Sequence, residues 1–110
     1  MSRWRWRVTL RVRRAVREHR VWFTQKAARE LEESVLRLDH ADALDILAGL
    51  TPEDAFQAFA SEVTGESLYV YRIRVSGVPL YIKLALRGRC DVISFHDDEG
   101  PADDEEVETD

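Results

Sequence analysis

Apolar and polar residues alternate with a period of two along residues 68–96. Three segments alternate in this way, Leu68–Val75, Val78–Leu86 and Cys90–His96, and each of the two connections between them contains a glycine. Such alternation is typical of strands, and glycine takes the positive φ that tight hairpins need. The pattern therefore predicts an antiparallel meander of three strands.

The central predicted strand, Val78–Leu86, has one apolar face and one polar face. Its even positions are all apolar, so that face is expected to point into the core. Its odd positions include Tyr81 and Lys83, which makes the other face aromatic and basic. In the first strand the odd positions are expected in the core, so the even positions Arg72 and Arg74 emerge on this polar face.

The third predicted strand completes the polar face. Ile93 and Phe95 are expected in the core, which leaves Ser94 and His96 on the opposite side. A shift of one residue in the pairing would move every side chain to the other face, so the strand register decides the site. In the expected register five side chains meet on one surface: Arg72, Arg74, Tyr81, Lys83 and His96.

Apolar residues at helical spacing characterise the chain before the meander. They predict a helix over Val8–His19, a short edge strand at Val21–Phe23, and a second helix over Gln25–Ser34 that Thr24 caps. The buried stripe of the second helix is expected to extend to Val35.

Capping residues mark two further helices. Asp39, with Asp42 three residues later, caps the third, which is expected to end at Gly49 in a left-handed conformation. Thr51 and Pro52 mark the start of a fourth, short helix, expected to run to about residue 59 and to bury its phenylalanines. Helices followed by a meander predict an α+β fold, with the helices packed on one face of a mostly antiparallel sheet.

Length and composition fit one soluble domain, predicted over residues 1–96. The chain has 110 residues and is 45% hydrophobic, which suffices for a modest core. Its single cysteine, Cys90, excludes an internal disulfide and fits a reducing compartment. No apolar run is long enough for a membrane span, and the N-terminus lacks the apolar stretch of a secretory signal. Metal-binding and nucleotide-binding motifs are missing, so neither a metal nor another cofactor is expected.

The formal net charge of −5 conceals a segregated distribution. Residues 1–30 carry ten basic side chains against two acids, and residues 67–96 carry five against one. A basic head and a basic sheet indicate a polyanionic partner. Residues 97–110 carry nine acids and no base, and are expected to be disordered. This acidic tail serves either to keep the protein soluble or to compete with nucleic acid for the basic face.

Tryptophan and arginine alternate over residues 3–7. These side chains either stack on bases and pair with phosphates, or belong to a frayed terminus whose tryptophans fold back on the core. Fraying is the expectation because chain termini are usually poorly ordered.

The five polar-face residues suit cleavage of RNA without a metal. In that reaction the 2′-hydroxyl attacks the adjacent phosphorus and the 5′-oxygen leaves, which needs a base, an acid and cations. His96 is the candidate for proton transfer, and Tyr81 for a hydrogen bond or a stack on a base. Lys83, Arg72 and Arg74 are candidate phosphate ligands. The alternative is an ordinary solvent-facing surface with an incidental histidine.

The segment FTQKAAREL resembles the helix that opens RelE-like domains. Four further segments carry a family resemblance: DILAGLTPEDAFQAF, VYRIR, LYIKL and VISFH. In order and spacing, from about Val21 to His96, they resemble the MqsR family of type II toxins within the RelE-like ribonuclease superfamily. The resemblance implies a RelE-like fold and a small cytoplasmic enzyme that cleaves mRNA without a metal. It also implies a cognate antitoxin, a helix-turn-helix repressor, as the protein partner.

The family's functional positions carry over in part. By resemblance, its tyrosine falls on Tyr81, the lysine two residues later on Lys83, and a basic residue after Ser-Phe on His96. The family usually offers a lysine where Gln57 stands, and often a glutamine near Leu68. Two supposed catalytic contributors are therefore missing or replaced.

Three functions remain open on the sequence. The first is a ribonuclease toxin of a toxin–antitoxin pair. The second is a RelE-like module that binds nucleic acid with weak or no cleavage, suggested by the two departures and the basic head. The third is a protein-interaction subunit whose open sheet edge accepts a strand from a partner.

Overall fold

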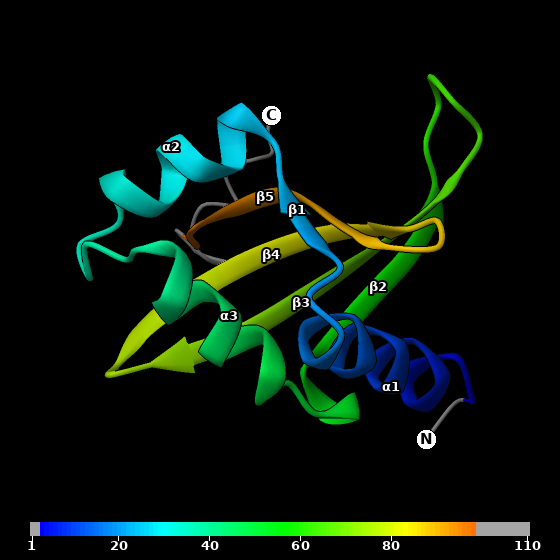
Figure 1. The fold of residues 1–110 in the computed structure, drawn as a ribbon, viewed down its shortest axis with the longest axis horizontal. Coiled ribbons are helices and arrows are strands. Elements are labelled where there is room, and N and C mark those ends of the chain that lie inside the picture. Colours follow the sequence, from blue (N-terminus) through cyan, green and yellow to red (C-terminus); the bar gives the residue numbers. More distant parts are fainter. Residues whose placement is uncertain (1–2, 99–110) are drawn as a thin grey trace, which may run out of the picture.

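The computed structural model of the chain describes residues 3–98, which form three α-helices and a five-stranded sheet (Figure 1). The helices are α1 (Arg3–Arg17), α2 (Gln25–Glu33) and α3 (His40–Ala48). The strands are β1 (Val21–Phe23), β2 (Ala55–Ala60), β3 (Ser67–Val75), β4 (Val78–Leu86) and β5 (Cys90–Asp97). The fold is α+β, and the predicted meander is confirmed as β3, β4 and β5.

The strands are ordered β1-β5-β4-β3-β2 across the sheet. β1 pairs with β5 in parallel, and all other pairs are antiparallel. Figure 1 shows α1 and α3 over one face of the sheet, whereas α2 lies beside β5. The opposite face of the sheet, here called the open face, carries the polar positions of the meander.

The core forms between α1, α3 and the covered face of the sheet. α1 buries Val8, Val12 and Ala15 there, because these residues recur on one side of the helix. The Thr9 hydroxyl lies 2.6 Å from the hydroxyl of Tyr71 on β3, and both side chains are buried. Burial raises the pKa of Tyr71 to about 12, so this tyrosine is a structural residue.

A bulge in β5 changes which residues of that strand face the core. Ser94 pairs with Lys83, but Val92 pairs with Leu84, so Ile93 has no partner in the ladder. Val92 is fully buried and Ile93 is not, so the expectation that Ile93 lies in the core is wrong. An extra residue in one strand reverses the parity beyond it.

The predicted fourth helix is wrong. Thr51 and Asp54 form a capping box, as their sequence suggests, but it starts only a 3₁₀ turn over Pro52–Asp54. The chain then continues as β2, antiparallel to β3. Its two phenylalanines are 49% and 38% exposed rather than buried. The edge of β3 would otherwise leave its backbone groups without strand partners, and this pairing outweighs the helical preference of Ala and Gln.

The helix at the N-terminus begins at Arg3, five residues earlier than predicted. Trp4 stacks on Tyr69 with 6.0 Å between ring centroids, and Arg5 Nε donates to the Ala55 carbonyl at 2.9 Å. Residues 3–7 are therefore ordered by contacts with β2 and β3, whereas fraying was expected. The expectation that tryptophan folds back on the core is confirmed for Trp4.

Two details of the helix ends also differ from expectation. α2 ends at Glu33 and Ser34 is already extended, so Val35 is 70% exposed instead of buried. Gly49 has φ −96°, so it does not adopt the expected left-handed conformation. The Thr24 and Asp39 caps are confirmed.

The last element of the described chain is β5, which extends one residue beyond its predicted end to Asp97. Residues 99–110, most of the predicted acidic tail, lie outside the described residues. Within residues 3–98, no helix has the length and apolar character needed to cross a membrane.

Candidate active site

Three of the predicted site residues form a row across the open face. Arg72 on β3 pairs with Tyr81 on β4, which pairs with His96 on β5. The rings of Tyr81 and His96 stack with 4.9 Å between centroids and 12° between planes. Pairing across antiparallel strands puts side chains of one face in lateral contact, so the register alone brings these groups together.

The guanidinium of Arg72 is held on two sides. It lies 4.4 Å from the ring centroid of Phe56 on β2, and its Nε is 2.9 Å from a carboxylate oxygen of Asp98. Phe56 reaches this position because the β2–β3 register shifts between Ala55 and Gln57. Asp98 therefore compensates part of the positive charge at the row.

His96 makes a hydrogen bond that defines its free nitrogen. Nδ1 lies 2.8 Å from the carbonyl oxygen of Asp97. A carbonyl only accepts hydrogen bonds, so Nδ1 carries the proton in this contact. In the neutral ring Nε2 then keeps its lone pair, and the ring is prepared to accept a proton there.

The Tyr81 hydroxyl is suited to donate a hydrogen bond. Partial burial raises its pKa above the ordinary value; the nearby Asp98 carboxylate adds to this, and the Arg72 charge opposes it. A raised pKa keeps the phenol protonated at neutral pH. Tyr81 therefore serves as a donor to a ligand oxygen rather than as a base.

Lys83 lies in the next row on the same face. It pairs with Val70 on one side and with Ser94 on the other, two residues along β4 from Tyr81. Two residues of strand correspond to about 7 Å. The Lys83 ammonium can therefore reach a group bound over the Tyr81–His96 pair.

Arg74 shares the open face but lies apart from the other four. It pairs with Pro79 near the β3–β4 hairpin, and its Nη1 donates to the Gly77 carbonyl at 2.7 Å. Its side chain is exposed. The structure thus brings together Arg72, Tyr81, His96 and Lys83, and leaves Arg74 at the end of the sheet.

Sequence reasoning missed Lys26, which reaches the open face from α2. Its Nζ lies 2.8 Å from Ser94 Oγ and 2.9 Å from Glu30 Oε2. Glu30 also accepts the backbone N–H of Phe95 at 2.9 Å, which fixes α2 beside β5. Burial opposes ionisation of Glu30, but these two bonds outweigh it and hold its pKa below the usual value. No local signal marks Lys26, because its place depends on how α2 docks.

The two departures from the family pattern also lie on the open face. Gln57 pairs with Val70 and so extends the Lys83 row toward the β2 edge. Leu68 is buried and pairs with Ala85, one row further along the sheet. An amide and an aliphatic side chain therefore occupy the two positions at which the sequence departs from the resemblance.

Across residues 3–98, the structure holds no group of three or more His, Cys, Asp or Glu side chains placed to bind a metal ion. The polar groups around the Tyr81–His96 pair are the cations Arg72 and Lys83 and the Asp98 carboxylate that pairs with Arg72. The cations and the Tyr81 hydroxyl suit a phosphate ligand.

One comparison with known protein families identifies the chain. A family model described as "Motility quorum-sensing regulator, toxin of MqsA" matches residues 9–97. No curated protein matches the chain. The matched span contains every strand and all five predicted site residues. Because it covers well over half of the sequence, the chain belongs to the MqsR toxin family.

Proposed function

We propose that this toxin-family member is a metal-independent endoribonuclease that cleaves mRNA in the cytoplasm. One observation carries the proposal: the register sets Arg72, Tyr81 and His96 side by side, with Lys83 in the next row. Together they supply a base, a hydrogen-bond donor and two cations. Attack of a 2′-hydroxyl on its phosphodiester needs this set.

His96 takes the proton of the attacking hydroxyl. Its Nδ1 is engaged by the Asp97 carbonyl, so Nε2 is the accepting atom. The 2′-oxygen then bonds to phosphorus while the bond from phosphorus to the 5′-oxygen breaks. The products are a 2′,3′-cyclic phosphate and a free 5′-hydroxyl.

The other side chains act on the phosphate and on the leaving group. Lys83 gives a proton to the departing 5′-oxygen. Tyr81 donates a hydrogen bond to a non-bridging oxygen, and Arg72 balances the charge that develops there. Arg74 holds a phosphate outside the reacting nucleotides.

Expression in a tightly repressed host tests the catalytic assignment. His96→Asn and Tyr81→Phe should each slow cleavage, the first by about 100-fold or more and the second by about 10- to 100-fold. Primer extension on cellular mRNA and growth after induction are the measurements. His19→Asn and Tyr69→Phe are matched controls away from the open face. Intact mRNA with the unsubstituted chain would overturn the proposal.

A substrate with sulfur in place of the scissile 5′-oxygen tests the role of Lys83. A thiolate leaves without protonation, so Lys83→Ala should lose about 100-fold on the oxygen substrate and little on the sulfur substrate. An equal loss on both substrates would assign Lys83 to charge balance and remove it as the acid.

The partner is a cognate antitoxin, which we propose to be a helix-turn-helix protein encoded by a neighbouring gene. The matched family is described as the toxin of MqsA, and this supports the pairing. Co-purification of the two gene products should yield a stable complex that lacks ribonuclease activity. Failure of the neighbouring product to bind would contradict this part of the proposal.

The second candidate is a RelE-like module with weak or no catalysis, which binds RNA or its antitoxin. Gln57 and Leu68 favour it, because by resemblance the family usually has a lysine at the first position and often a glutamine near the second. It predicts binding of RNA by the unsubstituted chain with no cyclic phosphate product. Restoring the family residue with Gln57→Lys would then raise cleavage, because it adds a cation to the Lys83 row.

A further inference from the structure

One side of α1 carries a row of arginines that the proposed active site does not use. Five arginines recur every three or four residues, and all are exposed: Arg3, Arg7, Arg11, Arg14 and Arg17. Such spacing puts them on one side of a helix. The side that carries Val8, Val12 and Ala15 is buried against the core, so this arginine face points away from the sheet.

Most of the charge on the arginine face is uncompensated. Arg14 pairs with Glu18 at 3.2 Å. Among the described residues, no acidic side chain pairs with the other four arginines. Two further arginines of α1 serve the fold instead: Arg5 bonds to the Ala55 carbonyl and Arg13 to the Leu50 carbonyl. The helix therefore separates structural arginines from exposed ones.

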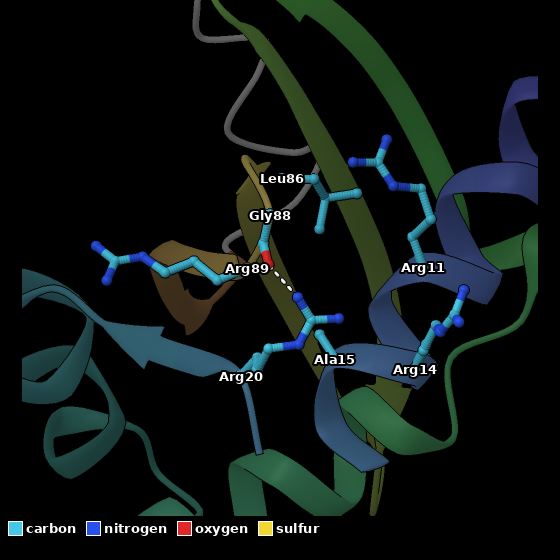
Figure 2. A pocket seen from close by; sticks show the side chains of 7 residues that line it. All are labelled: Arg11, Arg14, Ala15, Arg20, Leu86, Gly88 and Arg89. Atoms are coloured by element: carbon cyan, nitrogen blue, oxygen red, sulfur yellow. Dashed lines mark hydrogen bonds between the residues drawn. The ribbon is translucent and has the colours of Figure 1, made fainter. Parts of the chain in front are cut away.

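The surface beside the arginine face is hollowed at two places. One groove is lined by Leu10, Arg11, Arg13, Arg14, Arg17 and Glu18. A second, with a volume of about 130 Å³, lies between α1 and the β4–β5 turn (Figure 2). Arg11 and Arg14 line it from α1, and Arg20 lines it while donating to the Gly88 carbonyl. Arg20 also forms an ion pair with Glu18, the partner of Arg14, so the uncompensated charge in this groove comes from Arg11.

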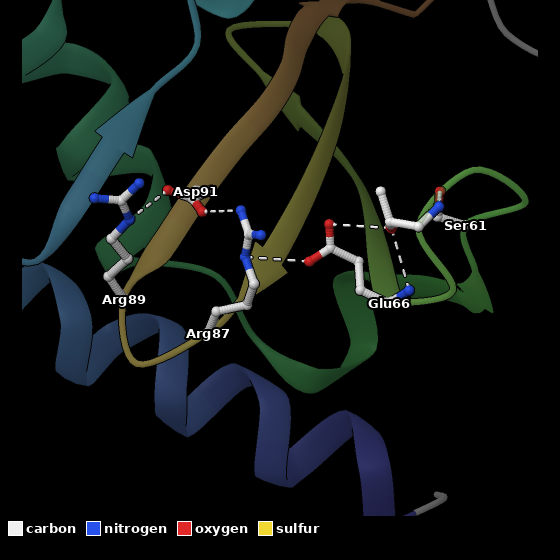
Figure 3. Close-up of polar contacts among 6 residues, drawn as sticks. Ser61, Glu66, Arg87, Arg89 and Asp91 are labelled. Atoms are coloured by element: carbon white, nitrogen blue, oxygen red, sulfur yellow. Dashed lines mark hydrogen bonds and ion pairs between the residues drawn. The ribbon is translucent and has the colours of Figure 1, made fainter.

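The turn arginines differ from those of the arginine face because they are balanced. Figure 3 shows Arg87 and Arg89 on either side of Asp91, with 2.8 and 2.9 Å ion pairs, and Arg87 also 3.1 Å from Glu66. The charge at the turn is therefore largely internal to the fold. The net positive field arises from α1.

The chemistry of the arginine face favours a nucleic-acid backbone. Guanidinium groups present planar donors that match phosphate oxygens. One turn of helix advances about 5.4 Å, so the side chains follow one another at a spacing suited to successive phosphates. Trp6, on the same side of the helix, is 53% exposed and offers a ring for base stacking.

A membrane surface fits the arginine face less well. A helix that lies in a lipid interface needs a continuous apolar face to insert. The apolar face of α1 is already buried in the core, and on the outward side only Trp6 and Leu10 are large, apolar and exposed.

We infer that the arginine face of α1 is a second RNA-binding surface, which holds the phosphate backbone of the substrate RNA away from the cleaved nucleotides. The choice of RNA rests on the proposed function. α1 packs on the covered face of the sheet through the Thr9–Tyr71 contact, whereas the Tyr81–His96 pair lies on the open face. The two surfaces therefore bind different segments of one RNA.

Binding can be measured without cleavage in a His96→Asn background. Arg7→Gln/Arg11→Gln is compared with Arg29→Gln/Arg37→Gln, which removes two exposed arginines elsewhere. Fluorescence anisotropy with a labelled RNA hairpin and its single-stranded flank, titrated from 50 to 300 mM salt, gives affinity and salt slope. Removing two phosphate contacts should reduce the slope by about 1.4 and weaken binding at low salt by roughly tenfold.

The comparison separates the possible results. A reduced slope in the Arg7/Arg11 variant alone, with Arg7→Lys/Arg11→Lys retaining binding, supports the inference. Equal slopes in both glutamine variants would overturn it.

A cleavage assay keeps this inference distinct from the proposed function. With His96 intact, the Arg7→Gln/Arg11→Gln variant should cleave a tetranucleotide at an unchanged rate and a long RNA with a raised KM. If the unsubstituted chain cleaves nothing, the proposed function fails while the binding result still stands. If the Arg7→Gln/Arg11→Gln variant cleaves both RNAs with the kinetics of the unsubstituted chain, the inference of a second binding surface is wrong while the proposed function stands.

Discussion

At the scale of single residues, Asp98 controls how much charge Arg72 can offer to a phosphate. Its carboxylate is 2.9 Å from Arg72 Nε, and its side chain is only 12% exposed. A phosphate bound over the Tyr81–His96 pair has to share this guanidinium with the carboxylate. Asp98 is therefore expected to weaken RNA binding.

Replacing Asp98 tests that competition. In the His96→Asn background, Asp98→Asn should tighten RNA binding by about fivefold, which corresponds to about 1 kcal/mol. The reason is the release of Arg72, and the measurement is anisotropy at low salt. Asp45→Asn removes the same charge from the exposed side of α3 and should change affinity little. Equal gains in RNA affinity for the two substitutions would show that net charge, and not the release of Arg72, strengthens binding.

A second residue pair, Thr9 and Tyr71, ties α1 to the sheet. Tyr71→Phe leaves the buried Thr9 hydroxyl without its 2.6 Å partner, so it should lower the free energy of unfolding by about 1–3 kcal/mol. Thr9→Val/Tyr71→Phe removes both polar groups and should cost less than the two single substitutions combined. Urea denaturation of the unsubstituted chain, the two single variants and the double variant measures the coupling between the two hydroxyls. Strictly additive losses of unfolding free energy would contradict this coupling.

At the scale of elements, α2 is attached to β5 through a carboxylate. Glu30 accepts from the Phe95 N–H and pairs with Lys26, and its pKa lies below the ordinary value of 4.5. A lowered folded-state pKa means that ionised Glu30 stabilises the fold above about pH 4.5. This contribution is lost as the pH falls through the lowered pKa.

Glu30→Gln should therefore destabilise the protein by about 1 kcal/mol at pH 7 and by progressively less at more acidic pH. Thermal unfolding of both proteins between pH 3 and pH 7 measures the difference. Glu32→Gln, an exposed position on the same helix, is the control. A Glu30→Gln difference that stays constant over this range would show that the carboxylate charge does not matter.

β2 forms hydrogen bonds with the edge of β3 although its own sequence favours a helix. Its sequence, AFQAFA, follows a genuine capping box and contains good helix formers. It is nevertheless a strand, because β3 offers a complete edge of backbone groups. Because this segment is a strand and not a helix, the Phe56 ring lies against the Arg72 guanidinium. Gln57 for the same reason lies in the row of Lys83.

At the scale of the whole molecule, charge is arranged in separate regions. The arginine face of α1 points away from the sheet, and the candidate active site lies on the open face. Residues 99–110 carry seven acids and no base. Removing them changes the formal net charge from −5 to +2, so long-range repulsion of RNA should fall.

A chain ending at Asp98 should accordingly bind RNA more tightly at low salt, by several-fold, with the gain disappearing at high salt. Anisotropy in the His96→Asn background measures it. A full-length variant in which asparagine and glutamine replace the seven acids keeps the length and should behave like the shortened chain. If the neutral tail behaves like the native one, the acids do not act through their charge.

Much of the fold follows from local pattern. Alternation with period two predicts β3, β4 and β5 together with their turns, and side-chain oxygens at Thr24 and Asp39 predict two helix starts. The row of Arg72, Tyr81 and His96 agrees with the register that parity and the short hairpins led us to expect. Local rules suffice here because the interacting groups are neighbours within a strand, a turn or a helix end.

Other features depend on contacts between distant segments. The sequence alone determined the α+β class, the meander and the basic character of its open face. Only the tertiary structure decided that β2 is a strand and that a bulge places Val92 in the core in place of Ile93. It also decided that the Lys26 ammonium contacts the Ser94 hydroxyl. It likewise decided that Asp98 pairs with Arg72 and that α1 turns its arginines outward. Each of these depends on which surface a segment meets, and residue pattern fixes that only through packing of the whole chain.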